Sequence, residues 1–242
     1  MSTRDSHPRD SRGQSHVVGI VVLLGLAMLS LTVVTAGVGV VVDDTAASAD
    51  ATRVAAMLED AFRPTELTGT RTVAVPFADG DLHTETRSLR VLGSDGRVVY
   101  ATDTNAVVFD ADDHGVTSLA GATLLRNDGW AQVRRGLPVT VGEDVLVVGV
   151  VRVSGDVAVS GSGGSGARLR TVVTHDRASL GPGTYRLAVE TDHPEAFAAY
   201  YEDRNVTVST HDFDGDGRAS VVLAFPPARH AYVVTHDVEV ST

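Results

Sequence analysis

An uncharged run of 26 residues, Val17–Val42, limits most strongly what this chain can fold into. About 20 apolar residues in a helix cross the hydrocarbon core of a bilayer, so the run predicts a transmembrane helix. Three arginines precede it, whereas Asp43 and Asp44 follow it. Because basic residues stay on the cytoplasmic side, we expect a single-pass protein of the cell membrane with a cytoplasmic N-terminus and the bulk of the chain extracellular.

The way the run is processed is open to three interpretations. A secretory signal has an apolar stretch of about 7–15 residues followed by a small-x-small cleavage site. Here the nearest such site, Ala47-Ser48-Ala49, follows a much longer run, and cleavage there starts the mature chain at Asp50. A plain uncleaved anchor fits the length but gives no role to the junction Arg12-Gly13-Gln14-Ser15 before the run.

The junction carries the third interpretation. Arg12-Gly13-Gln14-Ser15, directly before an apolar run, resembles the class III signal of archaeal type IV pilins and archaellins, and uncharacterised haloarchaeal single-pass pilin-like proteins have the same kind of start. The resemblance implies that a prepilin peptidase cuts between Gly13 and Gln14, so that residues 1–13 are a leader peptide. It also implies three partners: the membrane, the peptidase, and homo- or hetero-assembly with other pilin-like proteins.

One position departs from the pattern of bacterial pilins. Their fifth mature residue is Glu, and the corresponding residue here is Val18. Two functions therefore stay open. The chain is either a pilin-like cell-surface structural subunit or accessory component anchored by its N-terminal helix, or a non-polymerising single-pass membrane-anchored extracellular binding module.

Residues 43–63 are Ala-rich and predict an amphipathic helical stem after the transmembrane helix of residues 14–42. Apolar side chains recur at helical spacing, at Val54, Met57, Leu58, Ala61 and Phe62. This spacing gives one apolar stripe, which packs on the outer domain or on neighbouring subunits, and we favour the domain. Pro64 is expected to end the helix.

The rest of the chain, residues 64–242, predicts an extracellular β-rich domain. Short β-branched segments alternate apolar and polar positions between turn residues such as Asp128-Gly129. The segment from Pro194 to Arg204 predicts one short helix. We read residues 160–166, SGSGGSG, as a flexible hairpin tip on one continuous sheet, or else as a divider of two β parts. The predicted fold class is α+β, with a long N-terminal transmembrane and amphipathic helix followed by a mainly antiparallel β domain.

The charged residues narrow the class of partners. All 20 basic residues are arginines, 23 of the 31 acidic residues are aspartates, and the net charge is −11. This balance argues against a nucleic-acid partner, since phosphate binding needs clustered Lys and Arg. The Asp-rich, Lys-free composition resembles proteins of salt-loving archaea. With no cysteine, the chain has neither disulfides nor thiolate metal sites.

Catalytic motifs are not found. Around Ser165 the sequence GGSGA does not match the G-x-S-x-G nucleophile elbow, and a chain without lysine has no phosphate-binding G-x-x-x-x-G-K. We therefore predict that the protein is not an enzyme and has no cofactor; if a cation such as Ca²⁺ binds, we expect the binding to be weak and structural.

The Ca²⁺ prediction rests on Asp212, Asp214 and Asp216, which alternate along the segment DFDGDG. This matches the first half of a calcium loop, but the twelfth position is Leu223 where an EF-hand has Glu. The alternative, which we favour, is an acidic hairpin turn without a bound ion. The chain also contains one glycosylation sequon at Asn205.

A tripeptide Thr-His-Asp occurs three times, with its histidines at His175, His211 and His236. The residues leave two readings open: polar strand ends, which we favour, or a metal site if the strands bring the histidines together.

Overall fold

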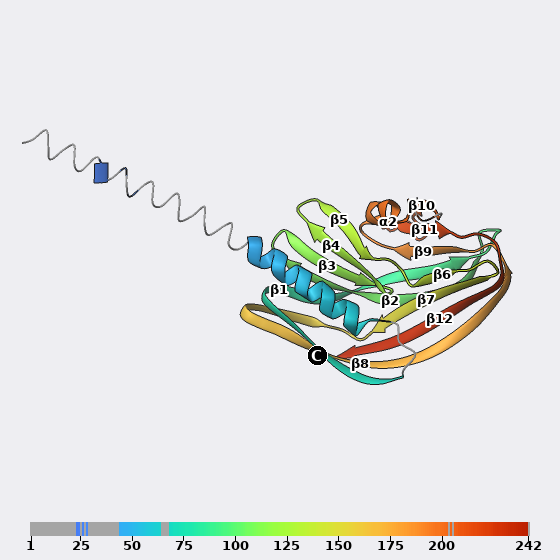
Figure 1. Cartoon of the computed structure of the whole chain (residues 1–242), viewed down its shortest axis with the longest axis horizontal. Coiled ribbons are helices and arrows are strands. Elements are labelled where there is room, and N and C mark those ends of the chain that lie inside the picture. The colour runs from blue at the N-terminus through green and yellow to red at the C-terminus, as the bar shows by residue number, and fades with distance from the viewer. Residues whose placement is uncertain are drawn as a thin grey trace, which may run out of the picture. The chain divides into compact units, whose positions relative to one another are not determined.

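The computed structural model describes residues 44–63, 68–202, 204 and 206–241, together with residues 23, 24, 26 and 28. The chain divides into two units, Met1–Thr45 and Ala46–Thr242. The second unit holds the β-rich fold (Figure 1). Most of the predicted stem therefore belongs to the same unit as the strands.

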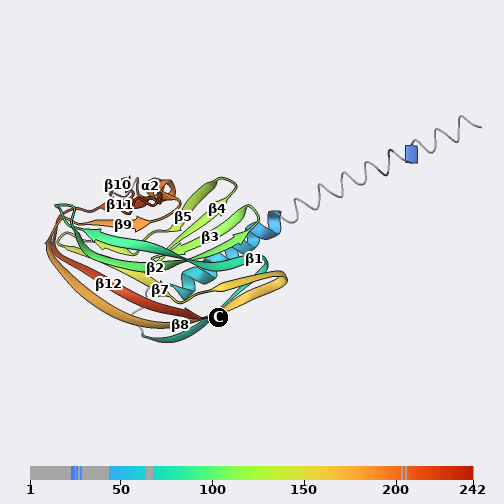
Figure 2. The ribbon, with the colours of Figure 1, turned by 180° about the vertical axis from the view of Figure 1, so that it is seen from behind.

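The described elements are a helix over residues 44–61, twelve strands and a second helix (Figures 1 and 2). In chain order they are β1 (Gly69–Leu92), β2 (Val98–Ala111), β3 (His114–Leu119), β4 (Ala122–Asn127), β5 (Trp130–Arg135), β6 (Val139–Val141), β7 (Val145–Ser154), β8 (Ala158–Gly183), β9 (Arg186–Glu190), α2 (Pro194–Tyr201), β10 (Thr207–His211), β11 (Ser220–Ala224) and β12 (Ala228–Ser241).

The long strand β1 organises the sheet, whose order is β5-β4-β3-β2-β1-β8-β12-β7-β6. Its first part pairs with β8 and its last four residues pair with β9, while β2 lines the other edge. β9 continues to β11 and β10. The recorded pairings are antiparallel except that between β12 and β7, which is parallel.

Two hydrophobic cores lie on opposite faces of the same strands. In β7, Leu146 and Val148 belong to the first core, whereas Val151 and Val153 belong to the second. Successive side chains of a strand point to opposite faces, so the change from even to odd positions moves burial from one face to the other. The sheet thus needs a separate cover on each face.

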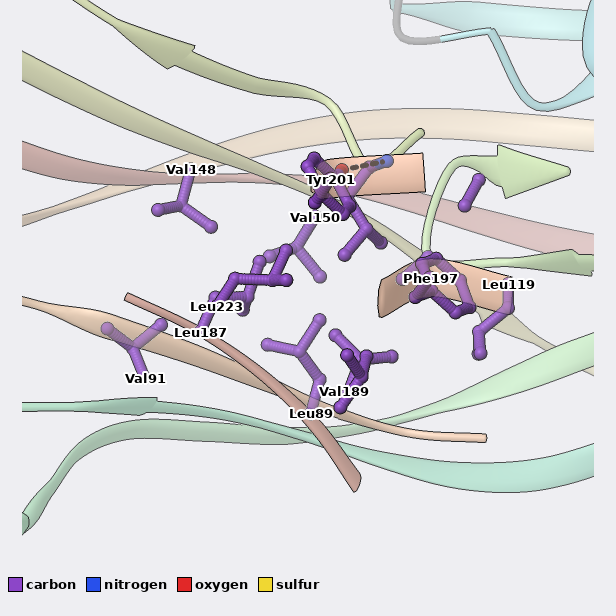
Figure 3. Packing of buried hydrophobic residues seen from close by; sticks show 14 of the residues in the cluster. Leu89, Val91, Leu119, Val148, Val150, Leu187, Val189, Phe197, Tyr201 and Leu223 are labelled. Carbon is purple, nitrogen blue, oxygen red and sulfur yellow. Dashed lines mark hydrogen bonds between the residues drawn. The ribbon is translucent and has the colours of Figure 1, made fainter. Parts of the chain in front are cut away.

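The first core is covered by β9, β11 and α2. Leu187 and Leu223 pack there with Phe197 of α2, all fully buried (Figure 3). α2 begins at Pro194, as predicted, and ends at Tyr201, earlier than the predicted Arg204. The Tyr201 hydroxyl accepts a hydrogen bond from the Leu137 amide at 3.0 Å, and burial raises the pKa of this phenol to about 12.

The second core is covered by the helix of residues 44–61. Val54, Leu58, Ala61 and Phe62 are buried against β1, β2, β7, β8 and β12, and Met57 is partly buried at its edge. The prediction that the stripe packs on the domain is confirmed. The helix is therefore one layer of the fold.

A buried carboxylate fixes the helix to β1. Asp50, in the helix, accepts hydrogen bonds from the backbone amide of Ala78 and from Arg53, the latter at 2.6 Å. Ala78 lies where the pairing of β1 with β8 shifts register. Such an irregularity frees a backbone amide from the ladder, and the carboxylate takes it up.

The predicted flexible tip at residues 160–166 is wrong. These residues lie inside β8, where five of the seven pair with β1, and Gly163 and Gly164, both at positive φ, lie at the shift of register. A Cβ at Gly166 would lie 2.9 Å from the Cα of Pro76, so the small residues allow the two backbones to approach. Glycine thus serves two purposes in this segment, close backbone packing at Gly166 and positive φ at Gly163 and Gly164.

The predicted fold class also needs correction. The chain is β-rich, and the described helices, over residues 44–61 and in α2, are both short. Among the described residues, no helix combines the length and the apolar character needed to cross a bilayer. An α+β chain led by a long transmembrane and amphipathic helix is therefore not what the described residues form.

The same finding overturns the predicted location as a single-pass protein of the cell membrane with a cytoplasmic N-terminus and an extracellular bulk. The helix of residues 44–61 carries charged side chains such as Arg53 and Glu59, and its apolar side is buried by protein. Of the predicted span at residues 14–42, only residues 23, 24, 26 and 28 are described.

Candidate functional site

The three aspartates of the predicted calcium loop lie between β10 and β11, and their carboxylates bind protein groups. Asp212 accepts hydrogen bonds from the amides of Asp214, Gly215 and Gly217, at 3.2, 2.7 and 3.1 Å. These amides, that of Gly215 first, hold the pKa of Asp212 below its ordinary value. The carboxylate therefore acts as the organiser of its own turn.

The other two carboxylates of this loop also have protein partners. Arg90 of β1 reaches both oxygens of Asp214, at 2.8 and 2.6 Å, and Asp216 accepts the amide of Arg218 at 2.9 Å. Within the described residues, no group of three or more His, Asp or Glu side chains is placed to hold a metal ion. Weak Ca²⁺ binding stays a prediction, and it competes with these bonds.

The structure brings together two of the three Thr-His-Asp copies. His175 of β8 lies directly opposite His236 of β12, and their Nδ1 atoms are 2.8 Å apart. His211 lies on β10, where its ring packs edge-on against Phe213 with centroids 4.5 Å apart. The three histidines therefore do not form one site.

The remaining predicted sites lie outside the described residues. These are the processing residues Arg12, Gly13 and Gln14 and the sequon residue Asn205. They stay predictions.

A buried charge network on β1 was missed by sequence reasoning. Arg87 is only 3% exposed and donates hydrogen bonds to Glu85 and Asp192, and to the carbonyl of Thr86 at 3.0 Å. Charged residues of β1 alternate with period two in the segment LHTETRSLRVL, but this pattern alone predicts a solvated face. Arg87 is buried because its partner Asp192 follows β9, one of the elements that cover the first core.

The network continues toward the β4–β5 hairpin. His83 lies 3.3 Å from Glu85 and 3.9 Å from Asp110. Asp110 in turn accepts a hydrogen bond from Arg126 of β4. These polar contacts therefore link β1, β2 and β4, and they end at Arg126, beside the tip of the β4–β5 hairpin.

At that tip lies Trp130, the one tryptophan of the chain, with 51% of its surface exposed. A depression of about 260 Å³ beside it is lined by Asp113, Arg126, Asn127, Asp128, Gly129, Trp130 and His193. A smaller one of about 90 Å³ lies between the hairpin and the helix, where Ser48 and Thr52 join its lining. We call these two depressions with Trp130 the Trp130 surface.

The Trp130 surface combines an exposed aromatic ring with side chains that donate and accept hydrogen bonds, some of them acidic and one of them basic. An indole ring offers a large apolar area at a small cost in conformational entropy, and it stacks on the C–H face of a sugar ring or on another apolar group. Neighbouring side chains such as Asn127 and His193 donate and accept hydrogen bonds. The arrangement suits recognition of a polar ligand. The sequence predicted only a hairpin turn here, because Asp113 and His193 are distant from Trp130 in sequence and only the fold brings them beside it.

The described residues thus form a β-rich fold in which the helix of residues 44–61 completes the second core, and Trp130 lies exposed at the β4–β5 hairpin tip. The chain belongs to a family of unknown function, DUF7289, whose model matches residues 12–241. No curated protein and no solved structure matches the chain.

Proposed function

We propose that the protein is a pilin-like structural subunit or accessory component of an assembly, matured by a prepilin peptidase between Gly13 and Gln14. The observation that supports it is the burial of the 44–61 helix in the second core. A subunit of this type needs its N-terminal segment joined firmly to the folded domain. Here the chain passes from the uncharged run into a helix whose side chains Val54 and Leu58 are fully buried.

The extent of the family match also supports this function. It begins at Arg12 and continues to residue 241, so one family unit includes the junction, the uncharged run and the β-rich fold. The N-terminal segment and the β-rich domain are therefore parts of one family unit. We further propose that the protein is archaeal and adapted to high salt, because its composition is rich in Asp and contains no Lys.

The mass of the mature N-terminus tests this function. We expect that the full chain, expressed with an archaeal prepilin peptidase, starts at Gln14, and that electron microscopy shows assemblies. Gly13→Ile is expected to block cleavage because a branched side chain hinders entry to the protease cleft. Gly19→Ile, the matched control, is expected to leave cleavage intact. A chain that keeps its leader in the presence of the peptidase, or that starts at Asp50, would contradict the proposal.

The Trp130 surface favours a second function, that of a binding module that does not polymerise. We infer a saccharide as its ligand, because an exposed indole beside carboxylate, amide and imidazole groups matches the alternating C–H and hydroxyl faces of sugars. As in the first function, no catalysis is proposed.

Fluorescence tests the binding module directly, because Trp130 is the only indole in the chain. Titration with neutral and acidic oligosaccharides is expected to shift its emission, and Trp130→Ala is expected to lose retention on the matching polysaccharide. Val99→Ala, which shortens another exposed apolar side chain, is the control. Retention that survives in Trp130→Ala would sink this second function.

A further inference from the structure

The pairing of β8 with β12 creates a two-histidine site. In the register of these strands His175 is opposite His236, Thr174 is opposite Asp237, and Asp176 is opposite Thr235. The two rings are nearly perpendicular, at 83°, with centroids 4.9 Å apart. Directly opposite residues of an antiparallel pair share one face of the sheet, so both imidazoles project to the same side.

The pair lies at the edge of the second core. Val173 and Val238, two residues away from each histidine, are buried there on the same face. On the other side of β12, His236 is in register with the buried Val151 of β7. Both histidines are half-buried, so the pair packs against hydrocarbon on one side and stays within reach of water on the other.

The neighbouring carboxylates have other partners. Asp237 accepts a hydrogen bond from Arg152, and Asp176 accepts the amide of Arg177 at 2.8 Å. Both aspartates follow a histidine directly and so point to the opposite face. Two ring nitrogens, and not a carboxylate cluster, define the site.

The two Nδ1 atoms face each other at 2.8 Å. Neutral imidazole is the commonest protein ligand of transition metals. The Nε2 atom of His175 is buried without a hydrogen-bond partner among the described residues, a cost that an apolar residue at this position would avoid.

The distance between the nitrogens is compatible with both rings binding one ion. Two imidazole nitrogens bound at about 2.0 Å to one ion are about 2.8 Å apart at a right angle, and about 3.3 Å apart at the tetrahedral angle. The observed 2.8 Å is that of a hydrogen bond between the two rings, and it is also compatible with the right angle, so the nitrogens need little movement to bind one ion. Tetragonal sites with nitrogen and oxygen ligands are typical of Cu²⁺ and Ni²⁺, whereas Zn²⁺ prefers a tetrahedron.

We propose that His175 and His236 bind one tetragonal divalent transition-metal ion, Cu²⁺ or Ni²⁺, through their Nδ1 atoms, with water in the remaining positions. In the hydrogen-bonded pair one ring carries its proton on Nδ1 and the other carries its proton on Nε2. Binding moves the Nδ1 proton to Nε2 of the same ring by exchange with water, so that each histidine keeps one proton and both Nδ1 lone pairs bind the ion. The bound ion ties β8 to β12 across the second-core edge. Cu²⁺ is the ion expected to bind more tightly.

Titration of the full chain with Cu²⁺ tests the site by calorimetry and electron paramagnetic resonance. We expect one ion per chain, with a tetragonal spectrum that shows coupling to two nitrogens. His175→Gln and His236→Gln are each expected to weaken binding by at least about 10- to 100-fold, the range for loss of an outer-shell partner, because each removes a ligand itself. His211→Gln removes the histidine of the third Thr-His-Asp copy and is expected to change nothing.

Undiminished two-nitrogen binding in the double variant His175→Gln/His236→Gln would overturn the site. Circular dichroism of each variant without metal checks its fold. If the double variant does not fold, nuclear magnetic resonance of the unaltered protein decides. Cu²⁺ is expected to broaden first the amide signals around His175 and His236, and broadening centred elsewhere would overturn the proposal.

Discussion

At the scale of single residues, burial sets the behaviour of Tyr201 on the first-core side. Its phenol accepts the Leu137 amide, and its pKa is raised to about 12 from an ordinary value of 10.0. The folded state therefore holds its proton more tightly than the unfolded state. The free energy of unfolding that the Tyr201 phenol contributes is fully present below pH 10 and is lost as the pH rises from 10 to about 12.

We expect alkaline unfolding to show this loss, which amounts to roughly 3 kcal/mol for two pKa units. The measurement is the free energy of unfolding in urea across that pH window. Tyr201→Phe is expected to be less stable at neutral pH by about 1 kcal/mol, because the Leu137 amide loses its acceptor, and to have a flatter pH profile. Parallel profiles for the two proteins would show that Tyr201 titrates normally.

At the scale of elements, the helix of residues 44–61 depends on one buried carboxylate for its position on β1. Asp50→Ala removes the acceptor of the Ala78 amide and the partner of Arg53. We expect a loss of about 1.5–3 kcal/mol in unfolding free energy, the range for hydrogen bonds to charged groups. The measurement is urea denaturation of the full chain.

Asp60→Ala is the matched control for that change. Asp60 is on the same helix but exposed, and it pairs with Arg71 at 3.3 Å. Exposed ion pairs contribute little, so we expect a loss below about 1 kcal/mol. Equal losses in the two variants would mean that Asp50 does not fix the helix.

Some features of these elements could be predicted from the sequence and others could not. The stripe that includes Val54 and Leu58 was found because a helix has a fixed local period, and the structure buries it as predicted. The burial of Arg87 was not predictable, since it depends on Asp192, 105 positions away in sequence. Likewise, the His175–His236 pair depends on strand register, which local patterns do not define. Long-range pairing, and not propensity, decided these sites.

Composition misled in two places for a physical reason. The Gly-Ser segment at 160–166 is equally suited to a flexible tip and to close backbone packing, and only the partner strand decides between them. Alternating aspartates such as Asp212 and Asp214 are equally suited to a cation and to backbone amides or an arginine. In both cases the residues fit two environments.

At the scale of the whole molecule, a net charge of −11 repels itself in the compact state. Salt shortens the Debye length from about 30 Å at 0.01 M to about 3 Å at 1 M, so we expect the melting temperature to rise with NaCl. Replacement of the exposed Asp112, Asp113 and Asp128 by Asn is expected to raise the melting temperature at low salt and to reduce the salt dependence. A melting temperature that does not change with salt would contradict this view.

The helix of residues 44–61 is one layer of the β-rich fold and covers its second core. Amide hydrogen exchange of the full chain tests this most directly, since buried elements exchange only through large-scale opening. Amides of residues 54–61 are predicted to be protected as strongly as those of β7 and β12. Exchange of these helical amides as fast as in a free peptide, while the strands stay protected, would contradict the claim.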